Sequence, residues 1–272
     1  MRAVGWVLGA TAAATAAVEV LNLWYAPEGG FSLAVRTGWA LLRTLGWLVL
    51  MWHVRRGRAA ARPLSLILAV TTVFAVGRLV VPREGVPPLP GVVGFVLLTV
   101  LCGTSVALLH RHPAVRAHLV RHPRRRIATG RGLEWRDAAP RQVTGWLVTA
   151  RVSAFTYSPL VLVPCVIAVG ELAEKPEYLL AVVFWFALGI AVSYAVLLTT
   201  YFLLRGRAWA RRAMTVVTLG VLALDLPLCW LLLGVDGLVR DGAPLVAAAA
   251  LTLVALYRAP AVEPVSTVGA TA

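Results

Sequence analysis

The sequence predicts an all-α protein, a polytopic bundle of eight transmembrane helices, and three observations support this class. Hydrophobic residues make up 60% of the 272 residues, and the mean hydropathy of +0.81 is far above that of a soluble domain. Eight apolar stretches are long enough to cross a bilayer core, which needs roughly 20 helical residues. Arginines cluster at alternate ends of these stretches, as expected when one side of the membrane retains basic residues.

The eight predicted spans follow one another closely, except where one long basic segment separates the fourth from the fifth. The fifth and sixth are long enough to tilt, and the last is short and begins with Ala243 and Pro244. Small residues at 10–17 would also suit a cleaved signal peptide. We favour a span because the apolar stretch continues to Trp24. The spans are 4–24, 31–54, 63–82, 91–110, 143–170, 178–204, 213–234 and 243–258.

The distribution of charge predicts a cell (plasma) membrane protein with both termini in the cytoplasm. If the N-terminus is inside, 19 of the 26 basic residues fall in cytoplasmic segments and seven of the 12 acidic residues fall outside. A net charge of +14 could indicate nucleic-acid binding, but the basic residues lie on one membrane side, so we expect no nucleic-acid partner. The basic residues placed outside are Arg36, Arg83, Lys175 and Arg240.

Two pairs of similar segments predict an internal duplication. RGRAAAR at 56–62 and RGRAWAR at 205–211 match at six of seven positions, and each links the second and third helix of a group of four. LHRHPAV at 109–115 and LYRAPAV at 256–262 match at five of seven positions, with a similar offset. The alternative is chance similarity in an arginine- and alanine-rich composition.

The duplication would divide the chain into two parallel four-helix repeats. Four is an even number of spans, so both repeats would enter from the same side and be related by a pseudo-twofold axis along the membrane normal. The predicted units are a first repeat at 1–110, a basic cytoplasmic connector at 111–142, a second repeat at 143–262 and a C-terminal tail at 263–272.

Five charged residues within predicted spans are the strongest pointers to function, because each costs about 2.5–3.5 kcal/mol at the centre of a bilayer on the insertion scale. We expect Glu19 to pair with Arg43 and Asp225 with Arg78, whereas Arg151 is close enough to the inner surface to extend into water. Such pairs would either fix helix packing or line a polar, outward-facing pocket in which a carboxylate binds a cation, relays a proton or acts as an acid.

Prolines near these charges predict interrupted helices. Pro227 follows Asp225 closely, and Pro159 follows Tyr157, so backbone carbonyls in both spans lack their usual donors. Interrupted helices beside an intramembrane charge are found in transporter binding sites. The alternative is an ordinary proline kink.

These observations favour a small-molecule transporter or permease-like subunit. The predicted solute-binding residues are Glu19, Arg43, Arg78, Asp225, Trp39, Trp185, Tyr157 and Tyr194. The first alternative is an intramembrane enzyme for a lipid or isoprenoid substrate, with terpene-cyclase-like chemistry. Glu19 or Asp225 would be its catalytic acid, and the deep aromatic rings would stabilise a developing cation.

A second alternative is a membrane scaffold or sensor that works through the connector 111–142. Its arginines would attract anionic lipids of the inner leaflet, and a cytoplasmic protein could dock there. We expect no cofactor and no metal, because the five histidines lie at or beyond the inner ends of spans and no cysteine or carboxylate joins them at ligand spacing. Phosphate-binding and hydrolase motifs are absent from the sequence.

Overall fold

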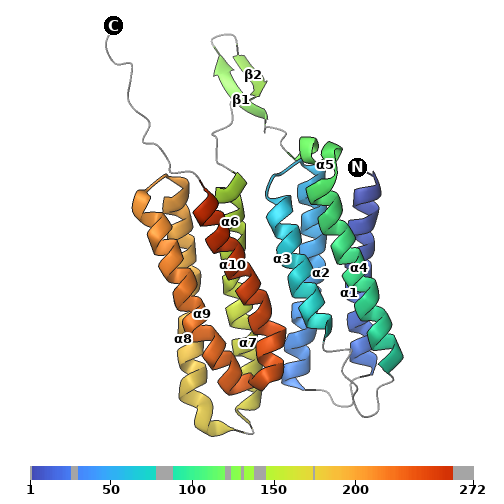
Figure 1. Ribbon diagram of the computed structural model, residues 1–272, viewed down its shortest axis with the longest axis vertical. Helices are drawn as coiled ribbons and strands as arrows, with labels where there is room; N and C mark the ends of the chain where they lie inside the picture. Colours follow the sequence, from blue (N-terminus) through green and yellow to red (C-terminus); the bar gives the residue numbers. More distant parts are fainter. Residues whose placement is uncertain are drawn as a thin grey trace.

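The computed structural model describes residues 2–25, 30–77, 88–119, 124–129, 132–137, 145–173 and 175–259, and it is a bundle of long helices (Figure 1). Six helical stretches of the described chain are long and apolar enough to cross a membrane, and a shorter apolar helix joins them. The number differs from the predicted eight for two reasons. The third predicted span has only 17 described helical residues, and the last two, which are separated by a sharp reversal at Gly234 without an intervening loop, count as one stretch, 208–258.

The first group of helices forms a closed ring around its own apolar core. Each helix contacts the next along the chain, and the fourth returns to contact the first. Trp47, Leu50 and Leu109 are fully buried within this core. The helices are α1 (Arg2–Trp24), α2 (Phe31–Arg55), α3 (Ala61–Gly77) and α4 (Pro88–Arg111).

The second group repeats this neighbour order around a second core that contains Tyr157 and Trp185. Its first predicted span is two helices with a break at Thr156, because Pro159 has no N–H to donate to the carbonyl of Phe155. The elements are α6 (Gly145–Phe155), α7 (Tyr157–Glu171), the short helix η2 (Pro176–Tyr178), α8 (Leu179–Leu204), α9 (Ala208–Gly237), the π-helical turn η3 (Leu238–Gly242) and α10 (Ala243–Arg258).

The chain reverses direction between α9 and α10, which lie side by side (Figure 1). Gly234 has φ 68° and ψ −165°, a conformation that glycine adopts readily because it has no Cβ. The expected interruption at Pro227 is absent, since α9 continues through this residue, and the departure from helical geometry lies at Gly234 instead.

The connector contains regular structure. It begins with the short helix α5 (Pro113–His118), in which His118 donates from Nε2 to the Val54 carbonyl at 2.9 Å. Strands β1 (Arg124–Thr129) and β2 (Gly132–Asp137) then form an antiparallel pair in which Arg124 lies opposite Asp137. The prediction of an all-α chain is therefore correct for the bundle and incomplete for the connector.

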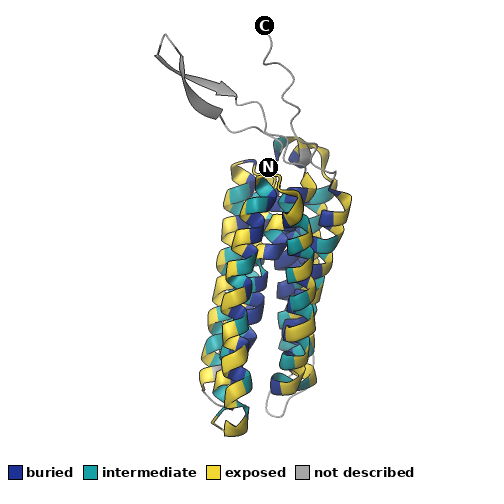
Figure 2. Cartoon of the chain, turned by 90° about the vertical axis from the view of Figure 1, so that its left-hand side faces the viewer, coloured by how far each residue is buried: buried dark blue, intermediate teal, exposed yellow. Residues whose placement is uncertain are grey.

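The outer surface of the bundle is apolar, as a membrane-embedded protein requires. Figure 2 shows buried residues on the inward sides of the helices and exposed residues on the outward sides. Leu180 and Tyr257, for example, are 82% and 90% exposed. Apolar area on this scale is unusual for a soluble monomer and suits contact with lipid.

The two groups meet through different helices. The first group contributes α2 and α3, and the second contributes α6 and α7 of its first predicted span, α10 of its last, and the turn η3. A twofold axis would bring equivalent helices of both groups together. The contacts among described residues do not follow that pattern, so the structure does not confirm the expected twofold relation.

Candidate functional site

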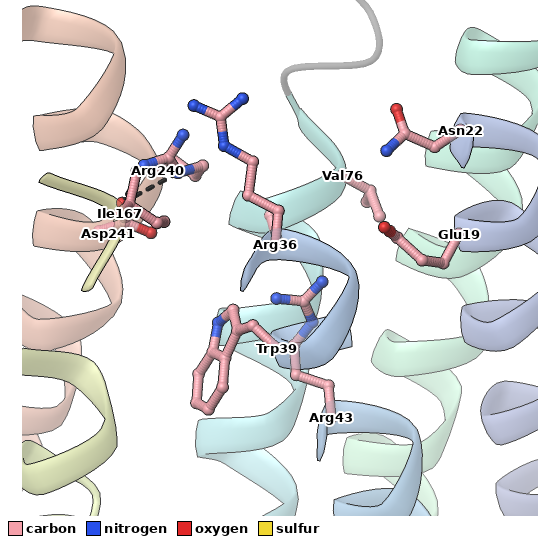
Figure 3. Close-up of a pocket in the computed structure, with 10 residues that line it drawn as sticks. Glu19, Asn22, Arg36, Trp39, Arg43, Val76, Ile167, Arg240 and Asp241 are labelled. Carbon is pink, nitrogen blue, oxygen red and sulfur yellow. Dashed lines mark hydrogen bonds and ion pairs between the residues drawn. The ribbon is translucent and has the colours of Figure 1, made fainter. Parts of the chain in front are cut away.

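A polar pocket lies between the two helix groups, near the ends of α1 and α3 and the start of α2 (Figure 3). Its volume is about 30 Å³. Three of its charged residues are arginines and two are acids, although all the surrounding helices are strongly apolar. The lining residues are Glu19, Asn22, Arg36, Trp39, Arg43, Ala75, Val76, Ile167, Arg240 and Asp241.

Helix α2 supplies three of these residues from one face. Arg36, Trp39 and Arg43 are separated by three and four positions, which places them in a row along a helix. Arg43 is only 6% exposed. Its Cζ lies 5.8 Å from the centre of the Trp39 ring, a cation–π distance.

The guanidinium groups of Arg36 and Arg43 have no hydrogen-bonding partner among the described residues. Among the described residues, neither makes a hydrogen bond or an ion pair, and the Nε atom of each is buried without an acceptor. In Figure 3 the guanidinium of Arg36 extends toward Arg240, whereas that of Arg43 lies beside Trp39. Since a buried donor without an acceptor typically costs 1–3 kcal/mol, and a charged one more, these groups favour an external acceptor.

Glu19 lies in the same pocket but does not neutralise Arg43 directly. Its Oε1 accepts a hydrogen bond from Oγ1 of Thr37 at 3.0 Å, which links α1 to α2. Glu19 and Arg43, which were predicted to pair, therefore line the same pocket. The described structure contains no ion pair between them.

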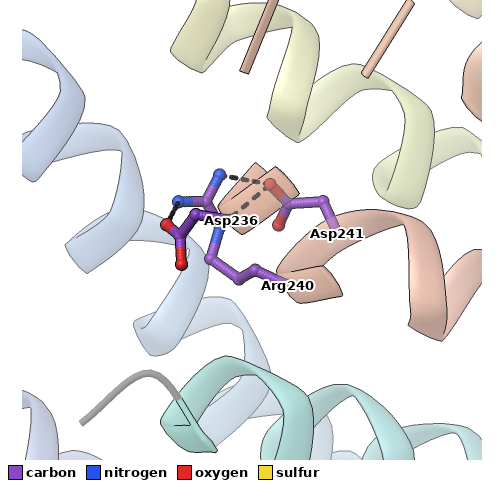
Figure 4. Close-up of polar contacts among 3 residues, drawn as sticks. All are labelled: Asp236, Arg240 and Asp241. Atoms are coloured by element: carbon purple, nitrogen blue, oxygen red, sulfur yellow. Dashed lines mark hydrogen bonds and ion pairs between the residues drawn. The ribbon is translucent and has the colours of Figure 1, made fainter. Parts of the chain in front are cut away.

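The third arginine of the pocket is already neutralised. Arg240 donates from Nε to Oδ2 of Asp241 at 2.9 Å and also contacts Asp236 at 3.9 Å (Figure 4). Arg240 and Asp241 are 8% and 7% exposed, although the sequence analysis placed both in an outer loop. The turn η3 buries them because it packs against α3, α7 and α10.

A smaller pocket of about 10 Å³ adjoins the first and shares Trp39, Arg240 and Asp241 with it. Pro159 and Pro164 of α7 line this space. The proline-rich part of the fifth predicted span therefore lies next to the intramembrane charges. This volume is at the lower limit for one water molecule, which needs about 10–15 Å³.

Asp225 and its neighbours form a separate buried cluster in the second group. Trp185 donates from Nε1 to Oδ1 of Asp225 at 2.7 Å, and both side chains are almost fully buried. Tyr157 shares a hydrogen bond of 3.2 Å with Thr218. The proposed partner of Asp225, Arg78, lies outside the described residues.

The remaining predicted residues lie away from both polar clusters. Tyr194 is 73% exposed on the outside of the bundle and does not line the pocket. Arg151 is also exposed, with its Cζ 5.6 Å from the Phe155 ring. Within the described parts of the chain, no group of three or more histidines, cysteines or acids is placed to hold a metal ion.

Sequence reasoning missed three important residues of the pocket: Arg36, Arg240 and Asp241. The spacing of Arg36, Trp39 and Arg43 along one helix face could have identified the first. No local pattern marks Arg240 and Asp241, because their burial depends on contacts with helices distant in the sequence.

No protein-family model, no curated protein and no solved structure matches this chain.

Proposed function

We propose that this chain is a small-molecule transporter, or the membrane subunit of one, with its solute site in the polar pocket. The observation that carries the proposal is the position of the pocket, which puts five charged side chains between two helix groups of an apolar bundle. Transporter sites are typically found between repeats, beside interrupted helices. The prolines of α7, which follow the break at Thr156, line the smaller pocket next to this interface.

The proposal includes eight spans, cytoplasmic termini and two repeats, and the matched segments support the duplication. Gly57 and Gly206 occupy the same place in the RGRAAAR and RGRAWAR segments and have φ values of 67° and 74°. In both, the N–H after the glycine donates to the carbonyl five residues earlier, the pattern of a Schellman cap. The arginine before each glycine lies 4.3 or 4.5 Å from an aromatic ring one turn earlier.

A second correspondence links the first and last helices of each group. Ser105 of α4 and Thr252 of α10 differ by 147 positions, the offset of the second pair of matched segments. Ser105 lies 3.4 Å from Thr11 of α1, and Thr252 donates to Ser153 of α6 at 2.8 Å. The same kind of hydroxyl contact thus joins equivalent helices, which favours duplication over chance similarity.

The enzyme and scaffold alternatives have less support. An acid catalyst for an apolar substrate should face an apolar pocket, but Glu19 shares its pocket with three arginines and Asp225 is bonded to Trp185 away from it. The scaffold alternative depends on the connector, in which side chains of β1 and β2 are not described. Binding of the connector to anionic lipids or to a cytoplasmic protein remains a prediction.

Solute flux through purified protein tests the proposal. Proteoliposomes would be loaded separately with labelled chloride, acetate, glycine and rubidium, and efflux would be compared with that of protein-free liposomes. We expect at least one solute to leave several-fold faster with the wild-type protein. Arg43→Gln should reduce this efflux by tenfold or more and Glu19→Gln should change it measurably, because both residues line the pocket.

Arg151→Gln is the matched control for Arg43→Gln. It removes one positive charge from a span, but the side chain is exposed and lies outside the pocket, so efflux should stay at the wild-type rate. Efflux of all four solutes at the protein-free rate would refute the proposal, as would equal rates in all variants.

A further inference from the structure

We infer that the solute site binds a compact, singly charged anion at the guanidinium group of Arg43, in the polar pocket that Arg36 also lines. This inference rests on the proposed function and deepens it, because it names the charge and size of the ligand. The observations that carry it are the charge balance of the pocket, the unpaired donors of its two arginines and its volume.

The described charges of the pocket do not balance. Arg240 and Asp241 neutralise each other through a direct hydrogen-bonded ion pair. Glu19 is then the one other carboxylate that lines the pocket with Arg36 and Arg43, so the lining has an excess of one positive charge. Asp236 and Glu171 also attract Arg36, but they lie outside the lining, and Asp236 is largely exposed to solvent. A charge removed from water is stabilised mainly by an opposite charge nearby, so one more anion would complete the site.

The donors of Arg43 are already directed to the pocket. Its side chain is 94% buried, yet it makes no hydrogen bond to a described residue, and its Nε atom has no acceptor. Trp39 covers one side of the group and offers no lone pair. An anion would accept charge-assisted hydrogen bonds from the guanidinium, and these are roughly twice as strong as neutral ones.

The volume restricts the ligand. A cavity of about 30 Å³ is two to three times the 10–15 Å³ needed for one water molecule, so it holds a halide ion or a carboxylate group but not a large organic anion. The amide of Asn22 adds a possible donor at its edge. A halide and a carboxylate are both compact anions that accept hydrogen bonds from a guanidinium, and the titrations with chloride and acetate distinguish them.

Anion-dependent thermal stability of the purified protein in detergent tests binding without any requirement for transport. Sodium gluconate, whose anion is too bulky for the pocket, would be replaced stepwise by sodium chloride or sodium acetate at constant ionic strength. We expect the unfolding midpoint to rise saturably with at least one of them, since a ligand that binds only the folded state stabilises it. The anion that acts at lower concentration identifies the preferred class.

Three variants make the test specific. Arg43→Gln should weaken the apparent affinity by tenfold or more, and Glu19→Gln should strengthen it several-fold, because it removes the competing negative charge. Arg151→Gln should titrate like the wild type. If Arg43→Gln does not fold, Arg36→Gln takes its place, since this side chain is only half-buried and should tolerate the change.

A midpoint that is equal in gluconate, chloride and acetate would overturn the inference, and so would wild-type titration of the arginine variants. Failure of the inference can be told apart from failure of the proposed function. Saturable anion binding without flux of any solute would support the anion site and contradict the transport function. Flux of rubidium or glycine without anion binding would support the transport function and contradict the anion site.

Discussion

Arg43 and Asp225 illustrate two ways in which an apolar bundle accommodates a charged residue. Asp225 accepts a hydrogen bond from Trp185 and is buried with it, whereas Arg43 faces a pocket and has no hydrogen-bonding partner in the described structure. Both were identifiable in the sequence because a charge within a span is costly. Their partners were not, since Trp185 and Asp225 are 40 positions apart and belong to different helices.

The Asp225–Trp185 hydrogen bond predicts an asymmetry between two substitutions. Asp225→Asn keeps an oxygen that accepts from the indole N–H, so the free energy of unfolding should change little. Asp225→Leu leaves that N–H buried and unpaired, which should lower the free energy of unfolding by about 1–3 kcal/mol. Thermal or detergent unfolding of the two variants measures the difference, and equal stability would show that the bond contributes nothing.

Element boundaries were largely predictable, because apolar runs end at arginines, glycines and prolines. The second span was expected at 31–54 and α2 spans Phe31–Arg55, and the last was expected at 243–258, as α10 is observed. The turn η3 was not predictable. Its charged and glycine residues resemble an outer loop, and only packing against three other helices makes it helical and buried.

The hairpin of β1 and β2 was missed for a similar reason. RRRIAT lacks the alternation of apolar and polar residues that indicates a strand, and in GLEWRD the alternation is limited to Leu133 and Trp135, which is too short to stand out. The break between α6 and α7, by contrast, follows directly from the chemistry of Pro159, and the sequence analysis expected disturbed backbone there.

Replacing a glycine by alanine should lower the stability of the protein in the two Schellman caps and raise it within a helix. Gly57→Ala and Gly206→Ala force a side chain into a left-handed conformation, which should lower the free energy of unfolding by about 1 kcal/mol each. Gly103→Ala, within α4, has open space around the new Cβ and should raise stability by about 0.5–1 kcal/mol. The unfolding midpoints of the three variants show whether each substitution lowers or raises stability. Destabilisation by all three would contradict the expected difference between the caps and the helix interior.

At the scale of the whole molecule, two four-helix rings meet through unlike faces. The duplication was predicted from two short matches and stays a prediction, although helix contacts follow a ring order within each group. The twofold relation was not observed, because the symmetry of a repeat says nothing about which faces pack together. The site lies at this interface, so its residues come from both groups and could not be collected from either one alone.

The proposed eight spans predict which side of the membrane each turn faces. Arg58→Cys and Arg207→Cys should react with a membrane-impermeant maleimide only from the cytoplasmic side, and Lys175→Cys only from outside. Cys102, Cys165 and Cys229 are buried and should give little background labelling. Labelling of all three introduced cysteines from one side would rule out the proposed topology.

The most direct measurement of the central claim, that the pocket between the helix groups holds an anion, is an anomalous diffraction experiment. The protein would be crystallised with sodium bromide, and anomalous differences would be collected at the bromine absorption edge. We predict a bromide peak in the pocket, within hydrogen-bond distance of the Arg43 guanidinium. A pocket without a peak, with the Glu19 carboxylate bonded directly to Arg43, would contradict the account.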